Sequence, residues 1–75
     1  MKEQLHNFIN NELIIVKSIN GKLSITVGTL VRLRKNAIQI QSEVKVGVNE
    51  FSKVHEYVPY NSIEKISTGQ KVLTR

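Results

Sequence analysis

The chain has 75 residues, with eleven Lys and Arg against six Glu, a formal net charge of +5 and no cysteine. This length excludes two domains and most enzyme scaffolds, since a domain usually needs about 100–150 residues. The absence of cysteine excludes disulfides, thiolate zinc sites and nucleophilic thiols. A domain of this size buries only about 60–65% of its unfolded surface, so association with copies of itself or with a partner would stabilise it.

The first ten residues predict a short amphipathic helix. Its apolar residues are spaced so as to share one helical face: Met1, Leu5, Phe8 and Ile9. The helix 1–10 is expected to stop at Asn10 or Asn11, because Asn tolerates left-handed backbone. Ten residues are too few for a helix that is stable alone, so we expect it to dock as a lid on one end of the domain.

The residues after the helix predict strands. Val and Ile make up 18 of the 75 residues and Ala occurs once, and β-branched residues favour strands over helices. A strand at 13–19 leads into Asn20-Gly21, a strong hairpin signal because both residues accept positive φ. In the next strand Leu23, Ile25 and Val27 alternate with polar residues until Gly28, which marks a bulge or a sharp bend.

The middle of the chain leaves one alternative open. The bent strand continues to Leu33, and Arg34-Lys35-Asn36 forms a polar turn. Apolar residues then alternate along 37–48. This segment is either one long bent strand or two strands separated by a turn at Ser42-Glu43.

The last third of the chain predicts a loop at 49–53, a strand at 54–58 and a final strand at 63–67. Pro59 ends the first of these strands or places it at an edge, because proline cannot donate to a ladder. The sum is a mainly β fold: a short N-terminal helix followed by a strongly bent, five-stranded antiparallel barrel of the SH3 or Sm-like type. We expect a single domain at 1–67 and a flexible basic tail at 68–75.

The order of these elements resembles that of the Sm-like barrels, including the bacterial RNA-chaperone type, and of small single-barrel proteins of spore-forming bacteria. The resemblance covers residues 1–67. The segments that support it are Asn20-Gly21, Gly28-Thr29-Leu30, Ala37-Ile38-Gln39-Ile40 and the "VPYNSIEKI" stretch at 58–66.

The resemblance implies two kinds of contact. In Sm-like proteins the turn after the bent strand presents an Asp and often an Asn to RNA bases or to neighbouring copies. The matching turn here is Arg34-Lys35-Asn36, which has no Asp and offers Asn36 as the matching residue. In Sm-like rings the fourth strand of one copy pairs with the fifth strand of the next. The implied oligomer interface comprises Val54, Val58, Ile63 and Ile66.

Histidine and glutamate form no pattern typical of catalysis or metal binding. His6 and His55 are far apart in the sequence, and the six Glu are scattered. His55 and Glu56 are adjacent on a predicted strand, so their side chains point to opposite faces. The four Gly are isolated and form no phosphate-binding loop. We therefore expect a protein that is not an enzyme and that uses no cofactor or metal.

The basic residues suggest nucleic-acid binding instead. Arg32, Arg34 and Lys35 can neutralise phosphates, with salt-sensitive affinity from counterion release. Single-stranded RNA or DNA also stacks on aromatic side chains, for which Tyr57, Tyr60 and Phe51 are candidates. The proposed contact residues are Arg32, Arg34, Lys35, Asn36, Tyr57 and Tyr60. The alternative is that the cations only keep an edge strand soluble and that the tyrosines pack at the barrel rim.

A second class of function is protein association without nucleic acid. A thin core and open strand edges favour self-association or pairing with an acidic partner protein, as in an adaptor or a phage-encoded inhibitor. No stretch approaches the roughly 18 apolar residues of a membrane helix. Polar residues interrupt the N-terminus, so it does not predict a signal peptide, which favours the cytoplasm.

Overall fold

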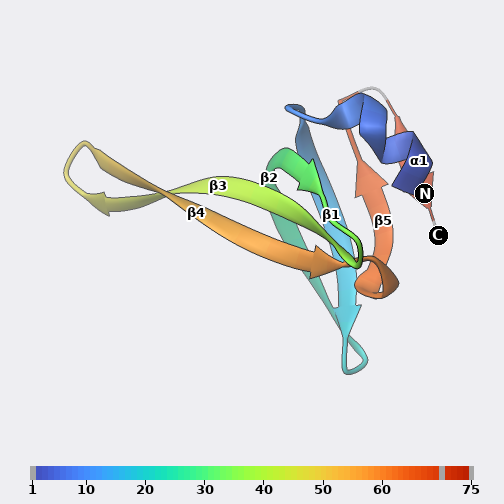
Figure 1. Cartoon of the computed structure of the whole chain (residues 1–75). Helices are drawn as coiled ribbons and strands as arrows, with labels where there is room; N and C mark the ends of the chain where they lie inside the picture. The colour runs from blue at the N-terminus through green and yellow to red at the C-terminus, as the bar shows by residue number, and fades with distance from the viewer. Residues whose placement is uncertain (1, 70, 75) are drawn as a thin grey trace.

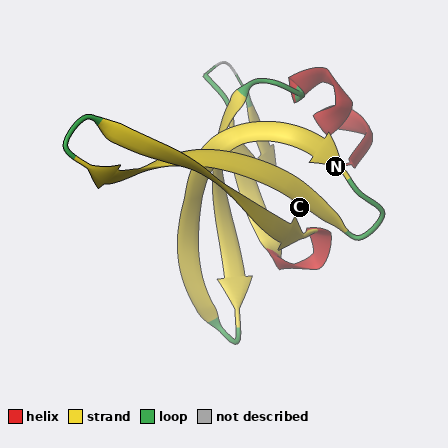
Figure 2. Ribbon diagram, turned by 60° about the vertical axis from the view of Figure 1, so that its left-hand side comes forward, coloured by secondary structure: helices red, strands yellow, loops and turns green. Residues whose placement is uncertain are grey.

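The structure, a computed structural model, describes residues 2–69 and 71–74 of the chain (Figures 1 and 2). In chain order the elements are α1 (Lys2–Leu5), the 3-10 helix η1 (His6–Phe8), β1 (Glu12–Ile19), β2 (Lys22–Leu33), β3 (Ala37–Gly47), β4 (Glu50–Pro59), the 3-10 helix η2 (Tyr60–Ser62), β5 (Ile63–Ser67) and β6 (Val72–Thr74). The fold is therefore mainly β, with one short N-terminal helical segment, as expected.

The strands form one antiparallel sheet in the order β4-β3-β2-β1-β5-β6. It curves around the core, as Figure 2 shows, but its end strands β4 and β6 do not pair with each other. The described chain thus has six strands in an open sheet, not five in a closed barrel. The additional strand, Val72–Thr74, lies in the segment expected to be a tail and pairs with Lys65–Ser67 of β5.

The N-terminal helical turns cover residues 2–8 rather than 1–10, and Met1 lies outside the described residues. Two of its apolar side chains reach the core: Leu5 and Phe8. Asn10 follows with a φ of 75°, the left-handed conformation expected of it. The helical segment lies beside β5 (Figure 1) and docks on the core through Leu5 and Phe8.

The core lies on the inner face of the curved sheet. Its side chains come from the N-terminal helix and all six strands: Leu5, Leu13, Ile15, Leu30, Ile38, Ile40, Val58, Ile63, Ile66 and Leu73. All of them are Leu, Ile or Val, the residue types most often found fully buried. Phe8, Leu33 and Tyr60 pack against its margin.

Two features of β2 explain how the sheet turns back on itself. Asn20 and Gly21 have φ values of 53° and 79° and form the expected tight hairpin between β1 and β2. At Gly28 an added Cβ would lie 2.5 Å from Cγ2 of Ile40. Only glycine permits β3 to approach this closely, so the predicted bend sits where the Ile40 side chain fills the space over β2.

The hairpin of β3 and β4 is longer than the sequence indicates. Residues 37–47 form one continuous strand without a turn at Ser42-Glu43. The loop expected at 49–53 is not present: a turn at Val48-Asn49, with Asn49 at a φ of 61°, leads directly into β4. The distal part of this hairpin projects away from the body (Figure 1), in keeping with extents of 39 × 29 × 24 Å.

Within the described residues, no helix has the length and apolar character needed to span a membrane.

Candidate nucleic-acid interface

The turn between β2 and β3 is fixed by backbone contacts and by Tyr60. The Arg34 N–H donates to the Ala37 carbonyl at 2.8 Å, and the Tyr60 N–H donates to the Asn36 carbonyl at 3.1 Å. The Tyr60 hydroxyl donates to the Arg34 carbonyl at 2.9 Å. Tyr60 therefore holds the turn at both ends, while the side chains of Arg34, Lys35 and Asn36 remain exposed.

Arg34 and Tyr57 form the aromatic and cationic centre of this region. The Arg34 guanidinium lies 5.3 Å from the centroid of the Tyr57 ring, within cation–π range. The Tyr57 side chain is 54% exposed. An exposed aromatic ring beside a guanidinium can take a base on its free surface while the cation meets a phosphate.

Arg32 reaches the same face through the strand register. It pairs with Gln39 across β2 and β3, and Gln39 pairs with Tyr57 across β3 and β4. Directly paired residues of antiparallel strands project to the same face. Gln39 also shares a 3.0 Å hydrogen bond with Nδ1 of His55. Arg32, Gln39, Tyr57 and His55 thus share the outer face of the sheet, opposite the core.

The basic side chains of this region have no carboxylate partners. The single ion pair among residues 2–69 and 71–74 joins Lys17 to Glu56. Arg32, Arg34 and Lys35 are all exposed, and their charges remain available to a ligand. The structure thus brings all six predicted contact residues together at one end of the sheet.

Tyr60 differs from Tyr57 in its surroundings. Its ring packs against the core, its hydroxyl is bonded to the turn, and Nζ of Lys2 lies 5.6 Å from its centroid. Burial raises the pKa of the Tyr60 phenol above its ordinary value of 10.0. Tyr60 is therefore a positioning residue for the turn, as the rim-packing alternative expects, and Tyr57 is the ring available for stacking.

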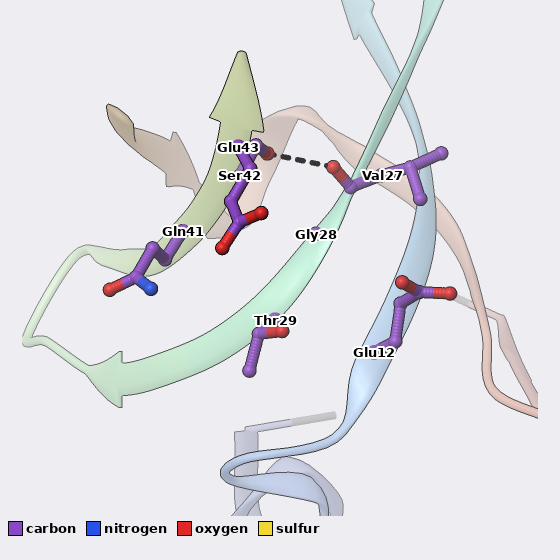
Figure 3. A pocket seen from close by; sticks show the side chains of 7 residues that line it. All are labelled: Glu12, Val27, Gly28, Thr29, Gln41, Ser42 and Glu43. Atoms are coloured by element: carbon purple, nitrogen blue, oxygen red, sulfur yellow. Dashed lines mark hydrogen bonds between the residues drawn. The ribbon is translucent and has the colours of Figure 1, made fainter. Parts of the chain in front are cut away.

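A pocket lies between β1, β2 and β3 (Figure 3). It is lined by Glu12, Val27, Gly28, Thr29, Gln41, Ser42 and Glu43. β2 and β3 diverge here: their ladder begins at Thr29 and Gln41, and the Ser42 hydroxyl donates to the Val27 carbonyl at 2.8 Å. The carboxylates of Glu12 and Glu43 make this side unfavourable for phosphate, so a nucleic acid would be confined to the basic end.

The residues predicted for an oligomer interface lie in two environments. Val58, Ile63 and Ile66 are core residues of the protomer, with at most 1% of each exposed. They cannot offer side chains to a second copy, because they already fill the inner face of the sheet. Val54 alone is exposed among the four. Its strand, β4, is an unpaired edge.

Sequence reasoning did not identify one large exposed surface, here called the apolar face. It comprises five side chains that are each 46–69% exposed: Ile14, Leu23, Ile25, Val27 and Val72. The register places Val27 beside Ile14, and both β1 and β6 flank Ser67 of β5. The alternation in β2 predicted that Leu23, Ile25 and Val27 share one face. Nothing in the sequence indicated that this face lies outside the core.

A polar contact links the hairpin to the body beside the core. Glu56 of β4 forms the ion pair with Lys17 of β1, and the Thr26 hydroxyl donates to it at 3.2 Å. The side chain of Lys17 is only 13% exposed. Among the described residues, no group of three His or Glu side chains is placed to hold a metal ion.

No protein-family model, no curated protein and no solved structure matches this chain.

Proposed function

We propose that this protein is a non-enzymatic, cytoplasmic regulatory module with an Sm-like fold, and that it binds single-stranded nucleic acid, in particular RNA. The observation that supports the proposal is the Arg34 guanidinium over the exposed Tyr57 ring, within a cluster of cations that have no carboxylate partner in the described part of the chain. Arg32, Arg34 and Lys35 contact phosphates, and Tyr57 stacks on a base.

The geometry favours a single strand over a duplex. A stacked base must be unpaired and splayed away from its neighbours, which single strands allow. Stacking on an aromatic ring contributes about 1–3 kcal/mol per base and tolerates any sequence. Gln39 and Asn36 lie on the same end of the sheet and supply amide groups that can bond to base edges. They provide selectivity in addition to the stacking and phosphate contacts.

The experiment is an anisotropy titration of a labelled single-stranded RNA dodecamer at two salt concentrations. Arg34→Glu with Lys35→Glu is expected to weaken binding at least about 30-fold, because two phosphate contacts become repulsive, and to flatten the dependence on salt. A matched control, Lys22→Glu with Lys65→Glu, changes the net charge equally at other exposed positions. It is expected to weaken binding only a few-fold.

Two tyrosine variants test the assignment of roles. Tyr57→Ala is expected to lose about 1–3 kcal/mol of binding free energy, whereas Tyr60→Phe keeps the ring, loses only the hydrogen bond to the turn and should weaken binding less. Equal losses in the two charge-reversal pairs, or no binding by the unmodified protein at low salt, would contradict the proposal.

A second function, a protein-interaction module, is favoured by the apolar face. Soluble monomers rarely expose large contiguous apolar surfaces, and such surfaces usually mark interaction sites. This reading predicts a stoichiometric partner protein that stays bound after nuclease treatment and at about 0.5 M salt, where the Debye length is about 4 Å. Ile25→Lys should release that partner, and Lys22→Glu should not. Loss of every co-purifying protein after nuclease treatment would contradict it.

A further inference from the structure

The two edge strands of the sheet differ in the length of backbone that is free to pair with another chain. β6 is three residues long, whereas β4 is a ten-residue strand that pairs only with β3. A long unpaired edge presents a row of free N–H and C=O groups that can bond to another strand. Pro59 lies at the end of β4, so the proline leaves the rest of that edge free to pair.

The strand pairing of Sm-like rings is obstructed in this chain. That arrangement needs the free edge of β5, but β6 pairs with residues 65–67 of β5. A second copy could not add its β4 there without displacing β6. The accessible long edge is therefore β4 itself, and a symmetric contact must join β4 to β4.

Antiparallel pairing of β4 with itself has few possible registers. Directly opposed residues must project to the same face, so a single residue faces its own copy at the two-fold axis. With Lys53 on the axis two like charges are opposed, which is unfavourable. With Val54 on the axis, Val54 faces Val54, and each Phe51 faces Tyr57 of the second copy.

The register centred on Val54 pairs the exposed apolar side chains of the edge. Phe51 is 63% exposed, Tyr57 54% and Val54 43%. Phe51 and Tyr57 lie on the outer face and Val54 on the inner face, because they alternate along β4. Aromatic pairs directly across antiparallel strands are favourable, and the two-fold axis produces this pair twice. A register centred on His55 would instead place Phe51 opposite Pro59.

We propose that the protein forms a two-fold dimer through antiparallel pairing of β4 with β4, centred on Val54. The contact makes one continuous sheet of the two copies. It is isologous and closes on itself, so it gives dimers and not rings or filaments.

The dimer also changes the surface proposed to bind RNA; this part of the inference rests on the proposed function. Phe51 of one copy lies beside Tyr57 of the other, next to the Arg34 guanidinium. Each binding surface then has two aromatic rings, and both surfaces share one sheet face. A strand of RNA that reaches both copies gains from effective concentration without any new contact.

The absence of cysteine allows a direct test by cross-linking. Opposed Cα atoms in an antiparallel pair lie about 4.5–5.5 Å apart, within the range that a disulfide spans. Under mild oxidation Val54→Cys should form a covalent dimer at least about tenfold faster than Val27→Cys, since the oxidation needs the proximity that only the axis gives. Val27 is a matched control, as it is 47% exposed.

Charge swapping tests the two-fold axis itself, with light scattering as the readout. The unmodified protein should have twice the chain mass, Val54→Lys and Val54→Glu should each be monomeric, and an equal mixture of the two should recover the dimer. Circular dichroism checks that each variant is folded. A monomeric unmodified protein, a larger ring, or a dimer broken by Val27→Lys but not by Val54→Lys would each overturn the proposal.

The outcome for RNA is separable from the outcome for the dimer. Arg34→Glu with Lys35→Glu should remain dimeric while losing RNA. Val54→Lys should still bind RNA, at an affinity reduced about 5–10-fold through the loss of the linked second site. A dimer that never binds RNA would contradict only the proposed function, and a monomer that binds it would contradict only the dimer.

Discussion

The two halves of the β3–β4 hairpin have the same pattern but opposite environments. In the proximal half Ile38, Ile40 and Val58 are at most 1% exposed. In the distal half Val44 and Val54 occupy the same inner face, with 45% and 43% exposed. The proximal half curves over the core, whereas the distal half extends beyond it (Figure 1). Alternation therefore shows which side chains share a face, and the rest of the fold decides whether that face is covered.

The largest expected effect contrasts a core residue with a distal one. Ile40→Ala should cost about 2–5 kcal/mol of unfolding free energy, because it leaves a cavity. Val46→Ala, at 62% exposure, should cost less than about 0.5 kcal/mol. Urea denaturation followed by circular dichroism measures both.

Ile40→Val supplies a graded alternative if the alanine variant does not fold. A domain of 75 residues is stable by only about 4–11 kcal/mol, so Ile40→Ala could unfold it. Ile40→Val should cost about 0.5–1.5 kcal/mol. Equal losses of unfolding free energy in the variants at residues 40 and 46 would show that the distal half of the hairpin is covered in solution.

The second contrast uses two glycines of the same sheet. Gly28→Ala places a Cβ at 2.5 Å from Ile40 Cγ2 and 2.7 Å from the Gln41 carbonyl oxygen. The backbone must move, so we expect a loss of about 1–3 kcal/mol. Gly47→Ala meets only the flexible Glu50 carboxylate, at 3.2 Å, and should be nearly neutral. Thermal unfolding of both variants tests this, and a harmless Gly28→Ala would contradict the close crossing of β2 and β3.

Gly28 also explains the main difference between the sequence analysis and the structure. The missing Cβ must face Ile40, so the even-numbered residues of β2 face the core there. This places Thr26 and Leu30 inside, and it turns Leu23, Ile25 and Val27 outward. Their alternation was correctly recognised, but its direction depended on an approach between two strands that is not local in the sequence.

The other elements were also predictable where their cause is local in the sequence, and were not where they depend on a distant segment. The Asn20-Gly21 hairpin and the left-handed backbone at Asn10 were predictable, because those residue types accept positive φ. The strand at 50–53 and β6 were not, since both are held by pairing with a neighbouring strand. Within the site, the clustering of the basic residues was predictable because they lie in and beside one turn. The hydrogen bond from Tyr60 to Arg34 was not, because it joins residues 26 positions apart.

The third contrast concerns Glu56, which lies where the two halves of the hairpin meet. Glu56→Ala leaves the Lys17 ammonium without its partner at 13% exposure, and removes the acceptor of the Thr26 hydroxyl. Because Glu56 itself is 43% exposed, we expect a loss of only about 1–2 kcal/mol. The loss should shrink at high salt, as screening weakens the original pair. Glu64→Ala, at an exposed position, is the control. An equal loss of unfolding free energy in that variant would contradict a specific contribution of the Lys17–Glu56 ion pair.

The smallest expected effect tests whether the basic turn belongs to the stable body. Tyr60→Phe removes the hydrogen bond to the Arg34 carbonyl and should cost about 0.5–1.5 kcal/mol at neutral pH. Because burial raises the Tyr60 pKa above 10.0, the unfolded chain loses this proton before the folded one. The phenol's contribution is therefore complete below pH 10.0 and declines as the pH rises through the folded-state value.

The difference in stability between the unmodified protein and Tyr60→Phe should therefore narrow as the pH is raised above 10.0. The ultraviolet absorbance of the phenolate should follow the same ionisation, and subtracting the Tyr60→Phe titration isolates Tyr60 from Tyr57. A Tyr60 midpoint at or below 10.0 would mean that its ring is not packed against the core. The turn would then lack the support of Tyr60, and Arg34 would become ordered only when nucleic acid binds.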